Sequence, residues 1–211
     1  HEFMTLTDEQ EISLADNLRV EVSAVKNRIS MLHELNPMLG HRGCRLGIAY
    51  PEITEMQATA ILEATAELIK NGASVFPEIM IPLVGTVSEY TDQEKIVRRV
   101  AKIVSEKHGL KLDFMVGTMI ELPRACLTAD EIARKAEFFS FGTNDLTQTT
   151  FGFSRDDIGS FLPDYLERNI LPGDPFQSLD VKGVGKLVSM AVKLGRNVNK
   201  EIKIGICGEH G

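Results

Sequence analysis

The chain has 211 residues, 43% of them hydrophobic and 25% charged, which is typical of a globular protein with one large or two small domains. Its 23 basic and 30 acidic side chains give a net charge of −7 without a basic cluster, which argues against nucleic acid as a partner. Three widely spaced cysteines exclude a disulfide framework, and no apolar run approaches the roughly 20 residues that span a bilayer, so we expect a reducing cytoplasm and no membrane contact.

The first 50 residues predict a helical segment and then an irregular loop. Apolar residues recur at steps of three and four and indicate a helix over Asp8–Glu34, which Asn17 splits in two. Pro37 ends that helix, because the residue before a proline avoids helical geometry. In the loop that follows, Arg42 and Arg45 lie three residues apart. Their guanidinium groups fit a phosphoryl group or a carboxylate, and a structural salt bridge is the open alternative.

From residue 51 onward, amphipathic helices alternate with short apolar strands. Strands are expected at about 78–83, 114–120, 138–142 and 202–206, and helices at 52–71, 88–107, from Thr128 onward, and 183–194. We expect Met56 in the core and a capping box from Thr128 to Glu131. The long stretch 149–183 is expected to form short helical turns over the strand ends. Alternation at this spacing predicts parallel strands and an α/β fold.

Polar groups follow the ends of three predicted strands. Glu121 closes one strand, Asp145 follows the next, and Cys207 follows the last. Parallel neighbours would aim the two carboxylates at one point, and such a pair suits Mg²⁺. The alternatives are that each acid caps the next helix and that Cys207 is an inert thiol.

Catalytic groups at the carboxyl ends of strands are typical of the (β/α)₈ barrel. Four strands do not close a barrel. The sequence therefore leaves two architectures open: a small open sheet that is complete in itself, or part of a barrel whose other strands lie outside these residues.

Four ordered motifs carry a family resemblance. They are NPMLGHRGCRL at 36–46, GTMIELPRA at 117–125, SFGTNDLTQ at 140–148 and CGEHG at 207–211. They resemble the phosphoenolpyruvate-binding (β/α)₈ domain of the phosphoenolpyruvate-utilising enzymes, and within these the pyruvate phosphate dikinases. The resemblance covers the whole chain. It implies a partial (β/α)₈ TIM barrel of about four βα units, a single incomplete domain over 1–211, with a helical segment and arginine-bearing loop at 1–50 and the βα units at 51–211.

The resemblance also implies a magnesium site that binds substrate. By analogy, Glu121 and Asp145 hold Mg²⁺, which bridges the carboxylate and the keto or enol oxygen of pyruvate or phosphoenolpyruvate. Gly142, Thr143 and Asn144 would offer backbone amides, and Asn144 its side chain, to substrate oxygens.

Further roles follow from the same resemblance. Arg42 matches an arginine that grips the transferred phosphoryl group, with Arg45 a weaker candidate for that region. Cys207 matches the general acid/base that protonates the enolate carbon. Arg124 and Gln148 are candidates to support the metal carboxylates.

The family likeness implies a phosphotransferase that works with other domains. The full enzyme would interconvert ATP, phosphate and pyruvate with AMP, pyrophosphate and phosphoenolpyruvate, through a phosphohistidine domain of the same chain and as a homodimer. We expect that the nucleotide and phosphohistidine domains, the first three barrel strands and an arginine just before residue 1 lie outside the sequence. Two alternatives remain: an enzyme I-type phosphotransferase, and a catalytically inert binding or structural module.

Overall fold

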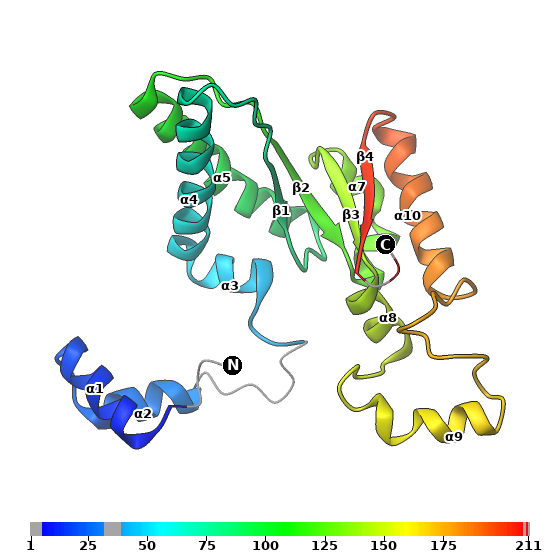
Figure 1. Cartoon of the computed structure of the whole chain (residues 1–211). Helices are drawn as coiled ribbons and strands as arrows, with labels where there is room; N and C mark the ends of the chain where they lie inside the picture. Colours follow the sequence, from blue (N-terminus) through cyan, green and yellow to red (C-terminus); the bar gives the residue numbers. More distant parts are fainter. Residues whose placement is uncertain (1–5, 32–38, 209, 211) are drawn as a thin grey trace. The chain divides into compact units, whose positions relative to one another are not determined.

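The computed structural model describes residues 6–31, 39–208 and 210, and the chain divides into two compact units, His1–Arg42 and Gly43–Gly211 (Figure 1). The first unit contains helices α1 (Asp8–Leu18) and α2 (Val22–Met31). This confirms the predicted split. The end of the expected helix, 32–34, lies outside the described residues.

A capping box and a left-handed residue delimit α1. The Thr7 hydroxyl accepts a hydrogen bond from the Gln10 amide (3.3 Å), and the Gln10 side chain accepts one from the Thr7 amide (2.9 Å). Arg19, at φ 55°, ends the helix two residues after Asn17. Lys26 of α2 then pairs with Asp8 at 2.9 Å, which ties the two helices together.

The second unit is a four-stranded parallel sheet with its crossover helices. Its elements are α3 (Gly43–Ala49), α4 (Pro51–Lys70), β1 (Glu78–Ile81), α5 (Val87–His108), β2 (Met115–Ile120), α6 (Pro123–Leu127), α7 (Ala129–Ala133), β3 (Phe138–Gly142), α8 (Thr143–Phe151), a 3₁₀ turn (Ile158–Ser160), α9 (Leu162–Glu167), α10 (Val184–Val198) and β4 (Lys203–Cys207). The strands pair in chain order, β1-β2-β3-β4, and all are parallel. The predicted α/β class and the four strands are confirmed.

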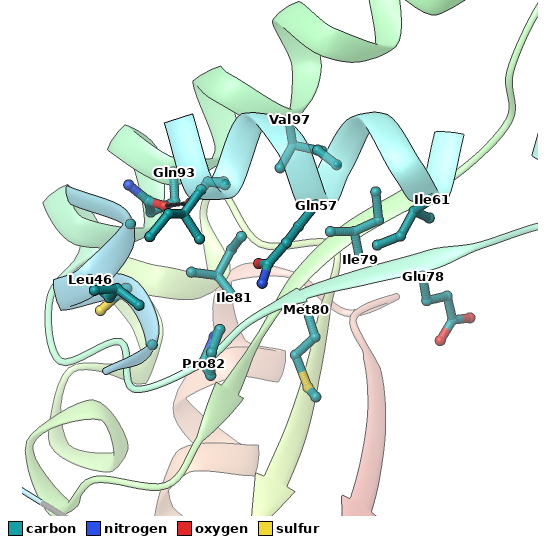
Figure 2. A pocket seen from close by; sticks show the side chains of 16 residues that line it. Leu46, Gln57, Ile61, Glu78, Ile79, Met80, Ile81, Pro82, Gln93 and Val97 are labelled. Carbon is teal, nitrogen blue, oxygen red and sulfur yellow. Dashed lines mark hydrogen bonds between the residues drawn. The ribbon is translucent and has the colours of Figure 1, made fainter. Parts of the chain in front are cut away.

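One face of the sheet packs against helices and forms the core. We call it the helix-covered face; its residues on β1 to β3 are Ile79, Ile81, Val116, Thr118, Ile120, Phe139 and Phe141, all buried. Figure 2 shows Ile79 and Ile81 pointing towards α4 and Met80 pointing to the opposite side of β1. Leu62 of α4, Val97 of α5 and Ala191 of α10 belong to the same core cluster. The alternation expected of strands therefore sorts side chains between the core and a second face.

That second face, which we call the open face, carries no residue of the main core. It is formed by Glu78, Met80, Met115, Gly117, Met119, Phe138, Ser140, Gly142, Lys203, Gly205 and Cys207. Glu78 of β1 and Lys203 of β4 form an ion pair, although two strands separate them in the sheet. The sheet therefore curls around its open face, so that the side chains of the outermost strands meet.

Three local predictions are wrong. Met56 is 62% exposed, because α4 turns Ala58, Leu62 and Ala66 towards the core and leaves the other apolar side outward. The predicted capping box is absent: Thr128 directly precedes α7, as the expected helix start requires, but its hydroxyl donates to the Arg124 carbonyl of α6 (3.1 Å) instead of accepting from the first turn of α7.

The loop predicted at 36–45 is also shorter than expected. Residues 36–38 lie outside the described residues, but α3 begins at Gly43, so Arg45 is helical. A backbone bond from the Cys44 amide to the Pro82 carbonyl (3.1 Å) fixes this helix start against the turn after β1.

Residues 149–151 of the stretch expected to form short helical turns belong to α8, and 152–183 forms such turns. Their side chains make a small separate core around Ile158, Leu162 and Phe176. Phe153 packs edge-on against Phe161, with ring centroids 4.9 Å apart, so the phenylalanines of this segment shield one another.

Candidate functional site

The strand register places three predicted residues in one row on the open face. Gly142 pairs with Cys207 across β3 and β4. Ile120 pairs with Phe141, so Glu121, the next residue, falls beside Gly142. A methyl group built on Gly142 would lie 2.9 Å from Glu121 Oε2, which confirms this proximity. Glu121, Gly142 and Cys207 are thus neighbours at the carboxyl ends of three adjacent strands.

The side chain of Glu121 is only 2% exposed, and a backbone hydrogen bond fixes its carboxylate. Its Oε1 accepts a hydrogen bond from the backbone amide of Leu83 at 2.7 Å. Its Oε2 lies against the bare backbone of Gly142, in the space that a side chain would fill. Burial of a carboxylate is costly without hydrogen-bond donors. The Leu83 amide supplies one donor, and the absence of a side chain at Gly142 leaves space for Oε2.

Helix α8 begins immediately after β3 and brings Asp145 to the same edge. Asp145 lies in the first turn of α8, where backbone amides have no partner within the helix. The Gln148 side chain donates to Asp145 Oδ1 (3.3 Å) and accepts from the Arg155 amide (2.9 Å). Gln148 therefore links Asp145 to the backbone of Arg155.

Backbone contacts join the end of β4 to the start of α8. The Thr143 hydroxyl donates to the Cys207 carbonyl at 3.1 Å. Gly208 has a φ of 94°, and a methyl group there would lie 2.8 Å from Thr143 Oγ1, so only glycine suits this position. The half-buried Cys207 thiol donates to the Phe141 carbonyl at 3.4 Å.

Asn144 provides an acceptor that is available for a ligand. Its Oδ1 is buried and, among the residues that the structure describes, has no hydrogen-bond partner. Buried acceptors of this kind normally have a partner, which makes this atom unusual. Within the same described residues, no group of three or more His, Cys, Asp or Glu side chains forms a metal site. The donor set here is two carboxylates and an amide oxygen, which are the hard oxygen ligands that Mg²⁺ takes.

The other two cysteines, Cys44 and Cys126, are buried. Burial raises the pKa of the Cys44 thiol to about 11 and that of Cys126 to about 12. Cys44 donates its proton to the Leu83 carbonyl at 3.3 Å. Cys207 is the most accessible thiol of the three.

The arginines fall into different places. Arg42 belongs to the first unit, and Arg45 belongs to α3 of the second unit. Arg124 donates to the Gly85 carbonyl in the turn after β1 rather than to a metal carboxylate. Leu83, which holds Glu121, was missed in the sequence, because a backbone donor in a left-handed turn leaves no side-chain pattern.

A separate pocket of about 370 Å³ lies between α3, α4, α5 and β1 (Figure 2). Its walls are mainly apolar, with Gln57 and Gln93 as polar groups. It contains none of the three residues of the Glu121 row. None of the helices in the described parts of the chain has the length and apolarity needed to cross a membrane.

Comparisons with known proteins find similarity over the full chain. Over the full chain, it is 57% identical to "Pyruvate, phosphate dikinase 1, chloroplastic" of Arabidopsis thaliana and 53% identical to "Pyruvate, phosphate dikinase" of Clostridium symbiosum. The chain spans 22% and 24% of the length of these relatives. The family described as "PEP-utilising enzyme, PEP-binding domain" matches residues 10–211. The chain therefore belongs to the family of PEP-utilising enzymes, in their PEP-binding domain.

Proposed function

We propose that this chain forms the phosphoenolpyruvate and pyruvate site of a pyruvate phosphate dikinase. The site would serve reversible phosphoryl transfer between a phosphohistidine and the enolate of pyruvate. The observation that carries the proposal is the row of Glu121, Gly142 and Cys207 beside the first turn of α8. In this row, Glu121 would bind the metal, Gly142 would let substrate approach the backbone, and Cys207 would donate a proton.

We further propose that the sheet is part of a (β/α)₈ barrel and that 1–211 is one incomplete domain. The curl of the sheet supports this. In a ring of eight strands spaced about 4.8 Å apart, strands three positions apart lie about 12 Å from each other. A lysine and a glutamate can span that distance, as Lys203 and Glu78 do here.

Glu121 and Asp145 would hold Mg²⁺, with the amide oxygen of Asn144 close to it or to the substrate. The bound ion would act as a Lewis acid that favours the enolate form of pyruvate. The protein's part is to bring oxygen ligands to one edge, to keep Glu121 away from bulk water, and to leave Gly142 without a side chain so that substrate can approach.

Cys207 would handle the carbon-bound proton. Its S–H proton would pass to the methylene carbon of the enolate to give pyruvate, leaving a thiolate, and the reverse step would restore the thiol. The thiol lies at the end of β4, and the Phe141 carbonyl that accepts its proton in this structure holds it at the site. The backbone amides at the start of α8 would bind substrate oxygens.

Arg42, the phosphohistidine domain and the homodimer complete the proposal. Arg42 would grip the phosphoryl group as it is transferred, which its place in the HRGCR motif supports. A reducing compartment fits the three free thiols in the described residues. For the whole enzyme, ATP, phosphate and pyruvate would be converted to AMP, pyrophosphate and phosphoenolpyruvate, and back.

Calorimetry with Mg²⁺ and oxalate, a mimic of the enolate, tests the site. The wild-type protein should bind oxalate only when Mg²⁺ is present, and Glu121→Gln should abolish that metal-dependent heat because it removes a ligand charge. Glu106→Gln is a matched control: this acid is exposed on α5 and pairs with Lys102 one helical turn away. Unchanged oxalate affinity in Glu121→Gln would contradict the proposal.

Nucleotide dependence separates this function from an enzyme I-type phosphotransferase. Formation of pyruvate from phosphoenolpyruvate should require AMP and pyrophosphate in the enzyme that contains this domain. Transfer to a carrier protein without nucleotide would favour the alternative.

A further inference from the structure

The turn after β1 holds a leucine in a left-handed conformation. Leu83 has a φ of 59°, is only 2% exposed, and points its backbone amide at Glu121 Oε1 (2.7 Å). A residue with a Cβ adopts this geometry rarely, and it persists where the surrounding structure enforces it. Contacts with other parts of the fold must therefore hold Leu83 in this conformation.

The start of α3 holds this turn from one side. The Cys44 amide donates to the Pro82 carbonyl at 3.1 Å, and the Cys44 thiol donates to the Leu83 carbonyl at 3.3 Å. Gly43 has a φ of 56° and packs so closely that a methyl group on it would lie 3.0 Å from Leu83 Cδ1. The peptide that presents the Leu83 amide is thus fixed on its carbonyl side.

Two further groups hold the other end of the turn. The Gly85 amide donates to Glu89 Oε2 at 2.8 Å, and the Gly85 carbonyl accepts a hydrogen bond from Arg124. Arg124 belongs to α6, which begins two residues after Glu121. The turn is therefore anchored to both helices that border the acid.

We propose that the turn 82–85 positions Glu121 for metal binding. Leu83 is the positioning residue, because its amide fixes Oε1 of the carboxylate while Oε2 faces Gly142. The Cys44 thiol locks the turn in that conformation. This inference rests on the proposed function, in which Glu121 is a metal ligand. Outer partners that orient a ligand commonly change metal affinity by about 10- to 100-fold when they are removed.

An amide-to-ester replacement tests the Leu83 donor directly. Incorporation of leucic acid in place of Leu83 removes the N–H and keeps the side chain. Calorimetry should then show Mg²⁺-dependent oxalate binding weakened by about 10-fold or more. Leu83→Ala, which keeps the amide, should melt at a lower temperature but bind within about twofold of wild type. Unchanged affinity in the ester variant would overturn the proposal.

Substitution of Cys44 tests the lock. Cys44→Ala removes the donor to the Leu83 carbonyl and should weaken Mg²⁺-dependent oxalate binding, while Cys44→Ser, which retains a donor, should recover most of it. Cys126→Ala is the matched control, since that thiol is equally buried and lies in α6, outside the turn 82–85. Equal affinities in the alanine and serine variants, or an equal loss in Cys126→Ala, would overturn the role of Cys44. If Cys44→Ala does not fold, the ester and serine variants decide.

Glu121→Gln distinguishes failure of this inference from failure of the proposed function. If Glu121→Gln binds Mg²⁺ and oxalate like wild type, Glu121 is not a ligand and both ideas fail. If Glu121→Gln loses binding while the ester variant keeps wild-type affinity, only the positioning role of Leu83 is wrong.

Discussion

The two faces of the sheet meet opposite demands. The helix-covered face is apolar, and its side chains on β1 to β3 are buried against α4, α5 and α10. The open face carries small, flexible and polar residues, and Glu121, Gly142 and Cys207 lie in a row at its carboxyl edge. A single strand such as β3 supplies both, because alternate residues point to opposite sides. In β3, Phe139 and Phe141 therefore contribute to the core, while Gly142, the residue after Phe141, belongs to the candidate site.

The largest expected effect tests the stabilising role of the helix-covered face. Phe139→Ala should lower the free energy of unfolding by about 3–5 kcal/mol, because it leaves a cavity in the core. The ring of Phe139 is fully buried, and a methyl group on Gly195 of α10 would lie 2.9 Å from it. Urea unfolding followed by circular dichroism measures the change.

Phe138→Ala is the matched control on the open face. Phe138 is adjacent in sequence and is also buried, but its ring packs over Gly117 on the open face and does not belong to the main core cluster, so its removal should cost less stability. Equal losses in the two variants would mean that the faces do not differ in the way described.

Thiol reactivity gives the next contrast. Iodoacetamide at pH 8 should modify Cys207 at least about a hundredfold faster than Cys44 or Cys126 in the native protein, since a thiol with a pKa of about 11 is a thiolate in only about one part in a thousand. The pKa of Cys126, about 12, lowers its thiolate fraction further. Peptide mapping by mass spectrometry measures the three rates. In urea they should become similar, and fast native labelling of Cys126 would contradict the burial.

The smallest effect concerns backbone approach within the open face. Gly142→Ala should weaken Mg²⁺-dependent oxalate binding by about tenfold, because the new methyl group meets Glu121 Oε2 at 2.9 Å and Met119 Sδ at 2.5 Å. Calorimetry measures the affinity.

Gly205→Ala controls for the change of residue type. Gly205 lies on the same face, in the row of Ser140, and a methyl group there has no neighbour within 4 Å. Its affinity and melting temperature should match those of wild type. A similar loss of binding in both variants would remove the special role of Gly142.

The sequence predicts the sheet better than the surroundings of the site. All four strands and the positions of Glu121, Asp145 and Cys207 at strand ends follow from apolar runs bounded by glycine and polar residues. Met56 was placed wrongly because α4 is apolar on more than one side, and only packing against α5 and β1 selects the buried side. Leu83 was missed because its contribution is a backbone amide, which no side-chain pattern reveals.

The small separate core in 152–183 affects how the protein unfolds. Its buried residues, Ile158, Leu162 and Phe176, form a core separate from that of the sheet. Opening this segment breaks its own small core and the contact of Leu179 with the main core, whereas exposing Phe139 requires unfolding of the whole unit. The polypeptide thus has two levels of cooperativity, and amide exchange reaches the segment after α8 long before it reaches β3.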